Sequence, residues 1–146
     1  MTHTERARER ILRLKAFVKT MAVGSAALPE YGILLTLVSE WRPNTEYTPD
    51  DIVSRPEIPM VYEVVQTVTS QAHQPPEAQG MLAIYRPIPQ RWPDGTITWV
   101  FGMTGITGMT VRHNGRRWGY IPQGGTAVVH EPSAALPAVW RDEGAI

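Results

Sequence analysis

The sequence contains no cysteine, so disulfide bonds and thiolate metal sites are excluded and small folded units cannot be cross-linked covalently. It also has no apolar run of the ~20 residues that a membrane-spanning helix needs. The N-terminus mixes Arg and Glu and lacks the continuous apolar core of a secretory signal. We therefore expect a soluble protein that is made in the cytoplasm and has no membrane partner.

The chain carries no net charge, because 14 Lys and Arg balance 14 Asp and Glu. This balance gives no long-range attraction to nucleic acid or to an anionic membrane. The distribution is uneven, since residues 1–19 have a net charge of +4, residues 20–85 of −6 and residues 86–146 of +2. A basic arm before an acidic segment allows pairing within the chain or with a neighbour, although solvated surface charge is the favoured interpretation.

Catalytic and cofactor-binding patterns are also missing. No two histidines have the i, i+4 spacing of a helical zinc site. The glycine-rich segment 102–108 lacks the Lys and the helix that follow a phosphate-binding loop, and the adjacent Asp50 and Asp51 would face opposite sides of a strand. We therefore expect no catalytic residues, no metal, no cofactor and no enzymatic activity.

The N-terminal segment is rich in good helix formers, and Thr2 and Glu5 have the spacing of a capping box. An apolar stripe of coiled-coil type runs along this predicted helix, and Gly24 is a plausible stop. Such a short helix must pack on something, either its own chain or copies of itself, so we expect a docking or oligomerisation segment, for instance in a trimer. The stripe consists of Ile11, Leu14, Phe17, Val18 and Met21.

The chain has thirteen prolines and twelve glycines, which favours short strands and frequent turns after the N-terminal segment. Residues 28–41 are the most apolar stretch, and their periodicity fits either a second short helix or a buried strand. Residues 61–69 are rich in β-branched side chains and predict a strand. Residues 109–121 predict a β-hairpin, because Asn114-Gly115 tolerates the positive φ values of a type I′ turn.

Two segments, residues 41–85 and 99–140, can be aligned with each other. Each has an opening Trp, an aliphatic strand, a hairpin into an aromatic strand, a His-x-Pro turn and a closing aromatic residue. Because a unit of ~45 residues cannot build a deep core, most of these aromatic side chains are expected to be buried. The expected core aromatics are Trp41, Tyr62, Trp118 and Trp140.

This layout resembles the chitin-binding type of carbohydrate-binding module, in which small β-sheets bind saccharides by stacking them on exposed Trp side chains. Asp51-x-Val53 stands for the family's Asp-x-Val strand, and Thr69-Ser70-Gln71 matches its Thr-Ser-Gln. His113-Asn114-Gly115-Arg116-Arg117-Trp118 is close to its Asn-Gly-Lys-x-Trp hairpin. The resemblance implies two small three-stranded β modules in tandem.

The sequence departs from the family where the exposed, sugar-stacking Trp precedes the x-Pro turn. His73 and His130 occupy these positions, and His is a smaller and weaker stacking surface than Trp. The resemblance therefore supports the fold more than it supports saccharide binding. The candidate glycan-binding residues lie near the two turns, with Trp92 as an outlying exposed candidate, and are His73, Tyr85, Trp92, His130 and Trp140.

The order of the parts also resembles a group of bacteriophage and prophage proteins, in which a basic helical N-terminus leads into tandem modules of this kind. Residues 37–41 occupy the junction found in those proteins, and Arg91-Trp92-Pro93 resembles their linker. The resemblance implies a component of the virion, on the capsid or the tail, whose partners are other virion proteins. This expectation comes from the family and not from composition or spacing.

We thus expect a mainly β protein with an N-terminal α-helical segment. The expected parts are a helical docking segment at 1–40, a first carbohydrate-binding-module-like domain at 41–88 and a second at 89–146. The expected function is that of a non-enzymatic phage virion component that adheres to glycans, with a purely structural decoration or connector protein as the alternative. A secreted glycan-binding module of an enzyme is disfavoured because the chain has neither a signal peptide nor a catalytic domain.

Overall fold

The computed structural model describes residues 2–6, 8–9, 27–49 and 51–146. Residues 3–6 and 8–9 are helical. The backbone N–H of Glu5 donates to Oγ1 of Thr2 over 3.1 Å, and the backbone N–H of Thr2 donates to the Glu5 carboxylate over 2.9 Å. These reciprocal bonds confirm the predicted capping box. The predicted docking stripe Ile11, Leu14, Phe17, Val18 and Met21 lies outside the described residues.

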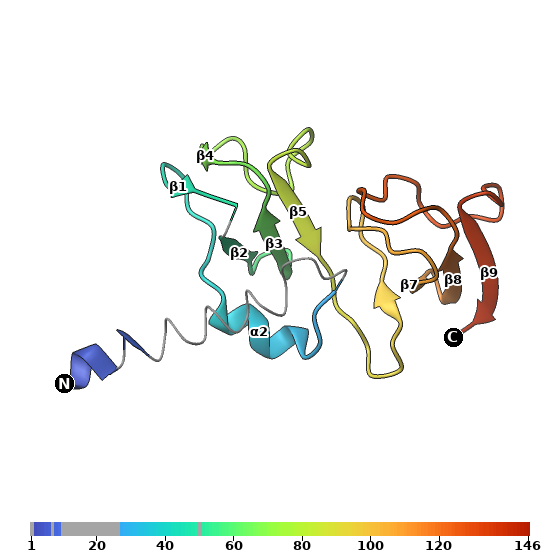
Figure 1. Ribbon diagram of the computed structural model, residues 1–146, viewed down its shortest axis with the longest axis horizontal. Coiled ribbons are helices and arrows are strands. Elements are labelled where there is room, and N and C mark those ends of the chain that lie inside the picture. The colour runs from blue at the N-terminus through green and yellow to red at the C-terminus, as the bar shows by residue number, and fades with distance from the viewer. Residues whose placement is uncertain (1, 7, 10–26, 50) are drawn as a thin grey trace.

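The apolar segment after residue 27 forms a helix, α2 (Tyr31–Leu37), which decides between the two alternatives that periodicity left open. Helix α2 buries Tyr31 and Leu34 against Val61 and Ile88. The Tyr31 hydroxyl accepts a hydrogen bond from the backbone N–H of Val61, which ties the helix to β3 of the first sheet. The helix therefore covers one face of the first sheet (Figure 1).

The first β unit contains two sheets. Strands β2 (Ile52–Arg55), β3 (Met60–Val64) and β5 (Tyr85–Ile88) form an antiparallel sheet in the order β2-β3-β5. Strands β1 (Glu46–Tyr47) and β4 (Val68–Thr69) form a separate pair. The strand predicted over residues 61–69 is therefore confirmed only in its first part, because the chain leaves the sheet after Val64 and pairs elsewhere.

The second β unit is one sheet with the order β6-β7-β8-β9. It contains β6 (Ile97–Thr98), β7 (Thr110–His113), β8 (Arg116–Tyr120) and β9 (Trp140–Ala145). Strand β6 runs parallel to β7, and the other pairs are antiparallel. The predicted hairpin is confirmed, since β7 and β8 are joined by Asn114 and Gly115 with φ values of 50° and 74°.

The expectation of two tandem three-stranded modules is wrong in its strand count. The described residues form sheets of two, three and four strands. The additional strands are β1, β4 and β6, each only two residues long, and their pairing depends on contacts outside the local sequence. The coarser expectation of a mainly β protein with helix near its N-terminus is confirmed.

The same contacts nevertheless recur in the two β units. The backbone N–H of Trp41 donates to Ser54 in the first unit, and that of Trp99 donates to Arg112 in the second, over 2.9 and 3.1 Å. Cross-strand pairs of the two sheets correspond as well, and they place an aromatic residue opposite an aliphatic or aromatic one. These pairs are Val53–Tyr62 and Val64–Tyr85 in the first unit and Val111–Trp118 and Tyr120–Trp140 in the second.

Each β unit has its own aromatic core, and a two-residue segment links them. Ala27 packs in the core of the second unit, whereas Leu28 packs under α2 in the first. Leu28 also forms backbone hydrogen bonds with Pro89 and Arg91, over 3.0 and 2.9 Å. The two units lie side by side in Figure 1, and this segment fastens the connection between them.

Candidate binding site

Two of the five residues predicted to bind glycan are buried. Tyr85 is 0% exposed and Trp140 is 2% exposed. The Tyr85 hydroxyl accepts a hydrogen bond from Nε1 of Trp41 over 3.0 Å, and Nε1 of Trp140 donates to the backbone oxygen of His130 over 3.0 Å. Their rings fill the two cores, so neither offers a face on which a sugar can stack.

The two histidines that replace the family's stacking Trp lie on exposed turns. His73 follows the end of β4, and His130 precedes Glu131, whose carboxylate is 2.7 Å from Nε2 of His113. The structure brings His130 and Trp140 together through the backbone contact described above. His73 lies in the first β unit and His130 in the second, so the two histidines lie on different turns.

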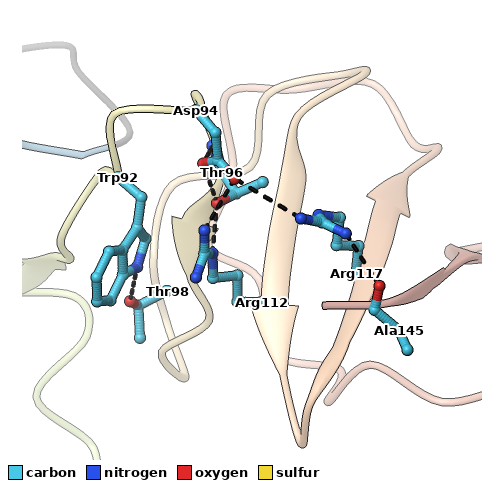
Figure 2. A network of polar contacts seen from close by, with 7 residues as sticks. All are labelled: Trp92, Asp94, Thr96, Thr98, Arg112, Arg117 and Ala145. Atoms are coloured by element: carbon cyan, nitrogen blue, oxygen red, sulfur yellow. Dashed lines mark hydrogen bonds and ion pairs between the residues drawn. The ribbon is translucent and has the colours of Figure 1, made fainter.

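Trp92 is partly buried in a polar network (Figure 2). Its Nε1 donates to Oγ1 of Thr98 over 2.9 Å, and the Arg112 guanidinium lies 4.6 Å from the ring centroid. Such a stacked cation stabilises by about 0.5–1 kcal/mol at an exposed site. One face of the indole is therefore covered by the protein itself.

The Asp94 carboxylate accepts several other hydrogen bonds of this network (Figure 2). Its carboxylate accepts from the backbone N–H and the hydroxyl of Thr96, over 3.0 and 2.6 Å, and from Arg112 over 2.8 Å. These bonds, led by that of the Thr96 hydroxyl, lower the pKa of Asp94 to about 2. Arg117 lies 3.9 Å from the same carboxylate and donates to the backbone oxygen of Ala145. These contacts, called the Asp94 network below, therefore hold the connection between the two units against the second sheet.

A cleft of about 550 Å³ lies between the two β units. Its lining includes Tyr62 and Pro87, which are cross-strand partners on β3 and β5. The first unit also contributes residues 76–80, Leu82 and Ala83, and the second unit contributes Val100 and Phe101. Its size falls within the range of about 300–1,000 Å³ that is typical of small-ligand sites.

Glu77 gives this cleft its polar group. Arg55 holds the Glu77 carboxylate with two hydrogen bonds, of 2.8 and 3.1 Å, and lies with its guanidinium 5.2 Å from the centroid of the Trp41 ring. Trp41 is fixed in turn by its bond to Tyr85. The core of the first unit thus sets the position of a carboxylate that remains open to solvent, with a side-chain exposure of 29%.

Tyr62 adds a hydroxyl to the same site. Burial, together with the nearby charge of Glu77, raises the pKa of Tyr62 to about 12. The phenol therefore stays protonated at neutral pH and can donate a hydrogen bond.

Phe101 provides the apolar surface, with 54% of the residue exposed. It is followed by Gly102, which has a φ of +86° and donates its backbone N–H to Val128 over 2.7 Å. A Cβ on Gly102 would overlap the Leu82 side chain of the first unit. The close approach of the two units at Gly102 therefore fixes Phe101 at the edge of the cleft. Phe101 was not singled out from the sequence, where the following glycine-rich segment 102–108 was considered only as a possible phosphate-binding loop and rejected.

The part of the chain that the structure describes contains no group of three or more metal-ligating side chains. Among these same residues, no helix is both long and apolar enough to traverse a bilayer. No protein-family model matches the chain, and no curated protein matches it either. The candidate site must therefore be interpreted from its own geometry.

Proposed function

We propose that this protein is a non-enzymatic component of a bacteriophage virion that adheres to glycans through its β units. The observation that supports glycan binding is the cleft between the units, which is lined by both a half-exposed Phe101 and the fixed carboxylate residue Glu77. An aromatic face combined with a small number of fixed polar groups is the usual composition of a small-ligand site. The assignment to a virion is supported by the order of parts in the sequence.

A purely structural role in the virion is the second candidate. It is favoured by the burial of Tyr85 and Trp140 and by the two histidines at the positions where the family has an exposed Trp. In this alternative the β units act as a decoration or connector, joined to other virion proteins as an oligomer such as a trimer, and bind no saccharide.

Both candidates are tested on purified phage particles and on the full-length chain. We expect the chain to remain with the particles through a density gradient, and the free chain to be retained on cell-wall material of the host. Absence from the particles would refute the virion assignment. Presence in the particles without retention on cell walls, and without binding at millimolar concentrations of oligosaccharide, would favour the structural role.

A further inference from the structure

The cleft between the β units has three features that bear on what it binds. It is formed by both units, since Glu77 comes from the first and Phe101 from the second. Among the described residues that line it, the one carboxylate is already paired with Arg55. Its polar lining residues Tyr62, Glu77 and Gln79 come from the first unit, and its exposed aromatic residue Phe101 comes from the second.

The charge balance of the cleft favours a neutral ligand. Among the described residues that line the cleft, only Glu77 and Tyr62 are ionisable, and the Arg55 guanidinium compensates the charge of Glu77. A phosphate or an acidic peptide would approach a carboxylate, and this described lining offers it no cation. Like charges that meet in a partly desolvated site are unfavourable.

The polar groups distinguish a saccharide from an apolar peptide side chain. An apolar side chain in the cleft would cover the Tyr62 hydroxyl without offering it a hydrogen bond, and a buried polar group without a partner is costly. The Glu77 carboxylate keeps its two bonds from Arg55 and has further lone pairs that a ligand hydroxyl can use. A pyranose carries hydroxyl groups on its rim and C–H groups on its faces, so it matches the carboxylate acceptor and the phenol of the first unit and the aromatic ring of the second.

We propose that the cleft is a composite saccharide site that exists only when both β units are in place, with Phe101 stacking on a neutral pyranose and Glu77 accepting its hydroxyl hydrogens. Arg55 and Trp41 position the carboxylate, and Leu82 packed on Gly102 sets the width between the walls. This inference rests on the proposed glycan-binding function. It differs from the sequence-based expectation, because it places the site between the units and not at the His-x-Pro turn of each.

The site is tested by titrating the full-length chain with a glucose tetrasaccharide and, separately, with an N-acetylglucosamine tetrasaccharide. Binding is measured by calorimetry and by the NMR shifts of backbone amides. We expect at least one saccharide to shift the amides of residues 77–83 and 100–102, and to leave the indole N–H of Trp92 unchanged. Removing the ring on which the sugar stacks is expected to weaken binding at least about tenfold, so Phe101→Ala should show this loss.

Two further variants separate stacking from general burial. Phe101→Leu keeps an apolar side chain but removes the ring, and we expect it to lose nearly as much affinity as Phe101→Ala. Glu77→Gln keeps the shape of the side chain and weakens the acceptor, so a loss of several-fold is expected. The matched control is Ile121→Ala, since Ile121 is 46% exposed and lies outside the cleft lining. Thermal unfolding checks that each variant is folded.

The outcomes separate this inference from the proposed function. Saccharide binding that is unchanged in Phe101→Ala and Glu77→Gln, with shifts near Trp92, His73 or His130, would overturn the composite site and leave glycan adhesion intact. No binding of either saccharide, or of host cell-wall material, by the wild-type chain would overturn both.

Discussion

A tryptophan, a basic side chain and a glutamate form the same cluster in both β units. In the first unit Arg55 lies over Trp41 and holds Glu77. In the second, the His113 ring contacts Trp99 with 4.9 Å between centroids and bonds to Glu131. The basic residue, Arg55 or His113, follows the buried Val53 or Val111 of its strand by two positions. The repeat therefore extends from the core residues to the polar groups around them.

At the scale of single residues, Asp94 makes a testable contribution to acid stability. Its pKa is about 2 in the folded chain, below the 3.8 of an unperturbed aspartate, so its ionised form stabilises the fold. This stabilisation is present above pH ~4 and is lost as the pH falls towards ~2. Asp94→Asn should therefore melt below the wild type at pH 5 to 7, and the two melting temperatures should converge at about pH 2.

Thermal unfolding followed by circular dichroism across this pH range measures the difference. Because Asp94 is at the surface, high salt should reduce the difference at neutral pH. Asp51→Asn is a suitable comparison, since the Asp51 carboxylate accepts only from the backbone N–H of Thr48 in the contacts described. A difference in melting temperature between Asp94→Asn and wild type that stayed constant down to pH 2 would show that the stabilisation does not depend on the charge of the Asp94 carboxylate.

At the scale of secondary structure, the elements with local signals were predictable and the shortest ones were not. The hairpin of β7 and β8 was predicted because Asn114-Gly115 specifies its turn, and the N-terminal cap because Thr2 and Glu5 have fixed spacing. Strands β1, β4 and β6 contain two residues each, so no period can be detected in them. Their pairing is decided by segments distant in the sequence, such as Glu46 with Thr69.

The same limit explains why the candidate site was missed. Its two main residues, Glu77 and Phe101, belong to different β units, and neither lies in a motif. Tyr85 and Trp140 were predicted both as members of the aromatic pattern and as ligand residues, and their burial supports only the first role. A pattern reports which side chains recur, whereas exposure depends on how the units pack against each other.

The hairpin turn gives a prediction with an internal control. Gly115 has a φ of +74°, and a Cβ added to it would meet no heavy atom within 4 Å, so Gly115→Ala adds strain without a clash. We expect a loss of about 1–2 kcal/mol in the free energy of unfolding. Gly32, in the exposed part of α2, also has open space around it but no positive φ.

Gly32→Ala should therefore act in the opposite direction and stabilise the chain by about 0.4–1 kcal/mol, because alanine restricts the unfolded chain and favours helix. Urea unfolding of both variants measures the two changes. Equal destabilisation by the two substitutions would contradict the conformational explanation.

At the scale of the whole molecule, the two β units are joined at separate points along their interface. The Asp94 network holds the connection between the units against the second sheet, and Leu82 packs on Gly102 beside the cleft. The segment of Ala27 and Leu28 places consecutive side chains into the two cores. A composite site requires such a fixed arrangement, since a binding group that is displaced by about 1 Å loses much of its effect.

This arrangement predicts that Leu28 couples the stability of the two units. Leu28 is 0% exposed, and Leu28→Ala should cost about 2–5 kcal/mol through lost burial and the cavity that remains. Because its backbone bonds Pro89 and Arg91, loosening this residue should also withdraw Ala27 from the second core.

Val64→Ala is the matched control, since Val64 is buried in the first unit alone. Amide exchange at Val111 and Trp118 should accelerate in Leu28→Ala and remain near wild type in Val64→Ala. Equal exchange at these two residues in both variants would show that the segment does not couple the units.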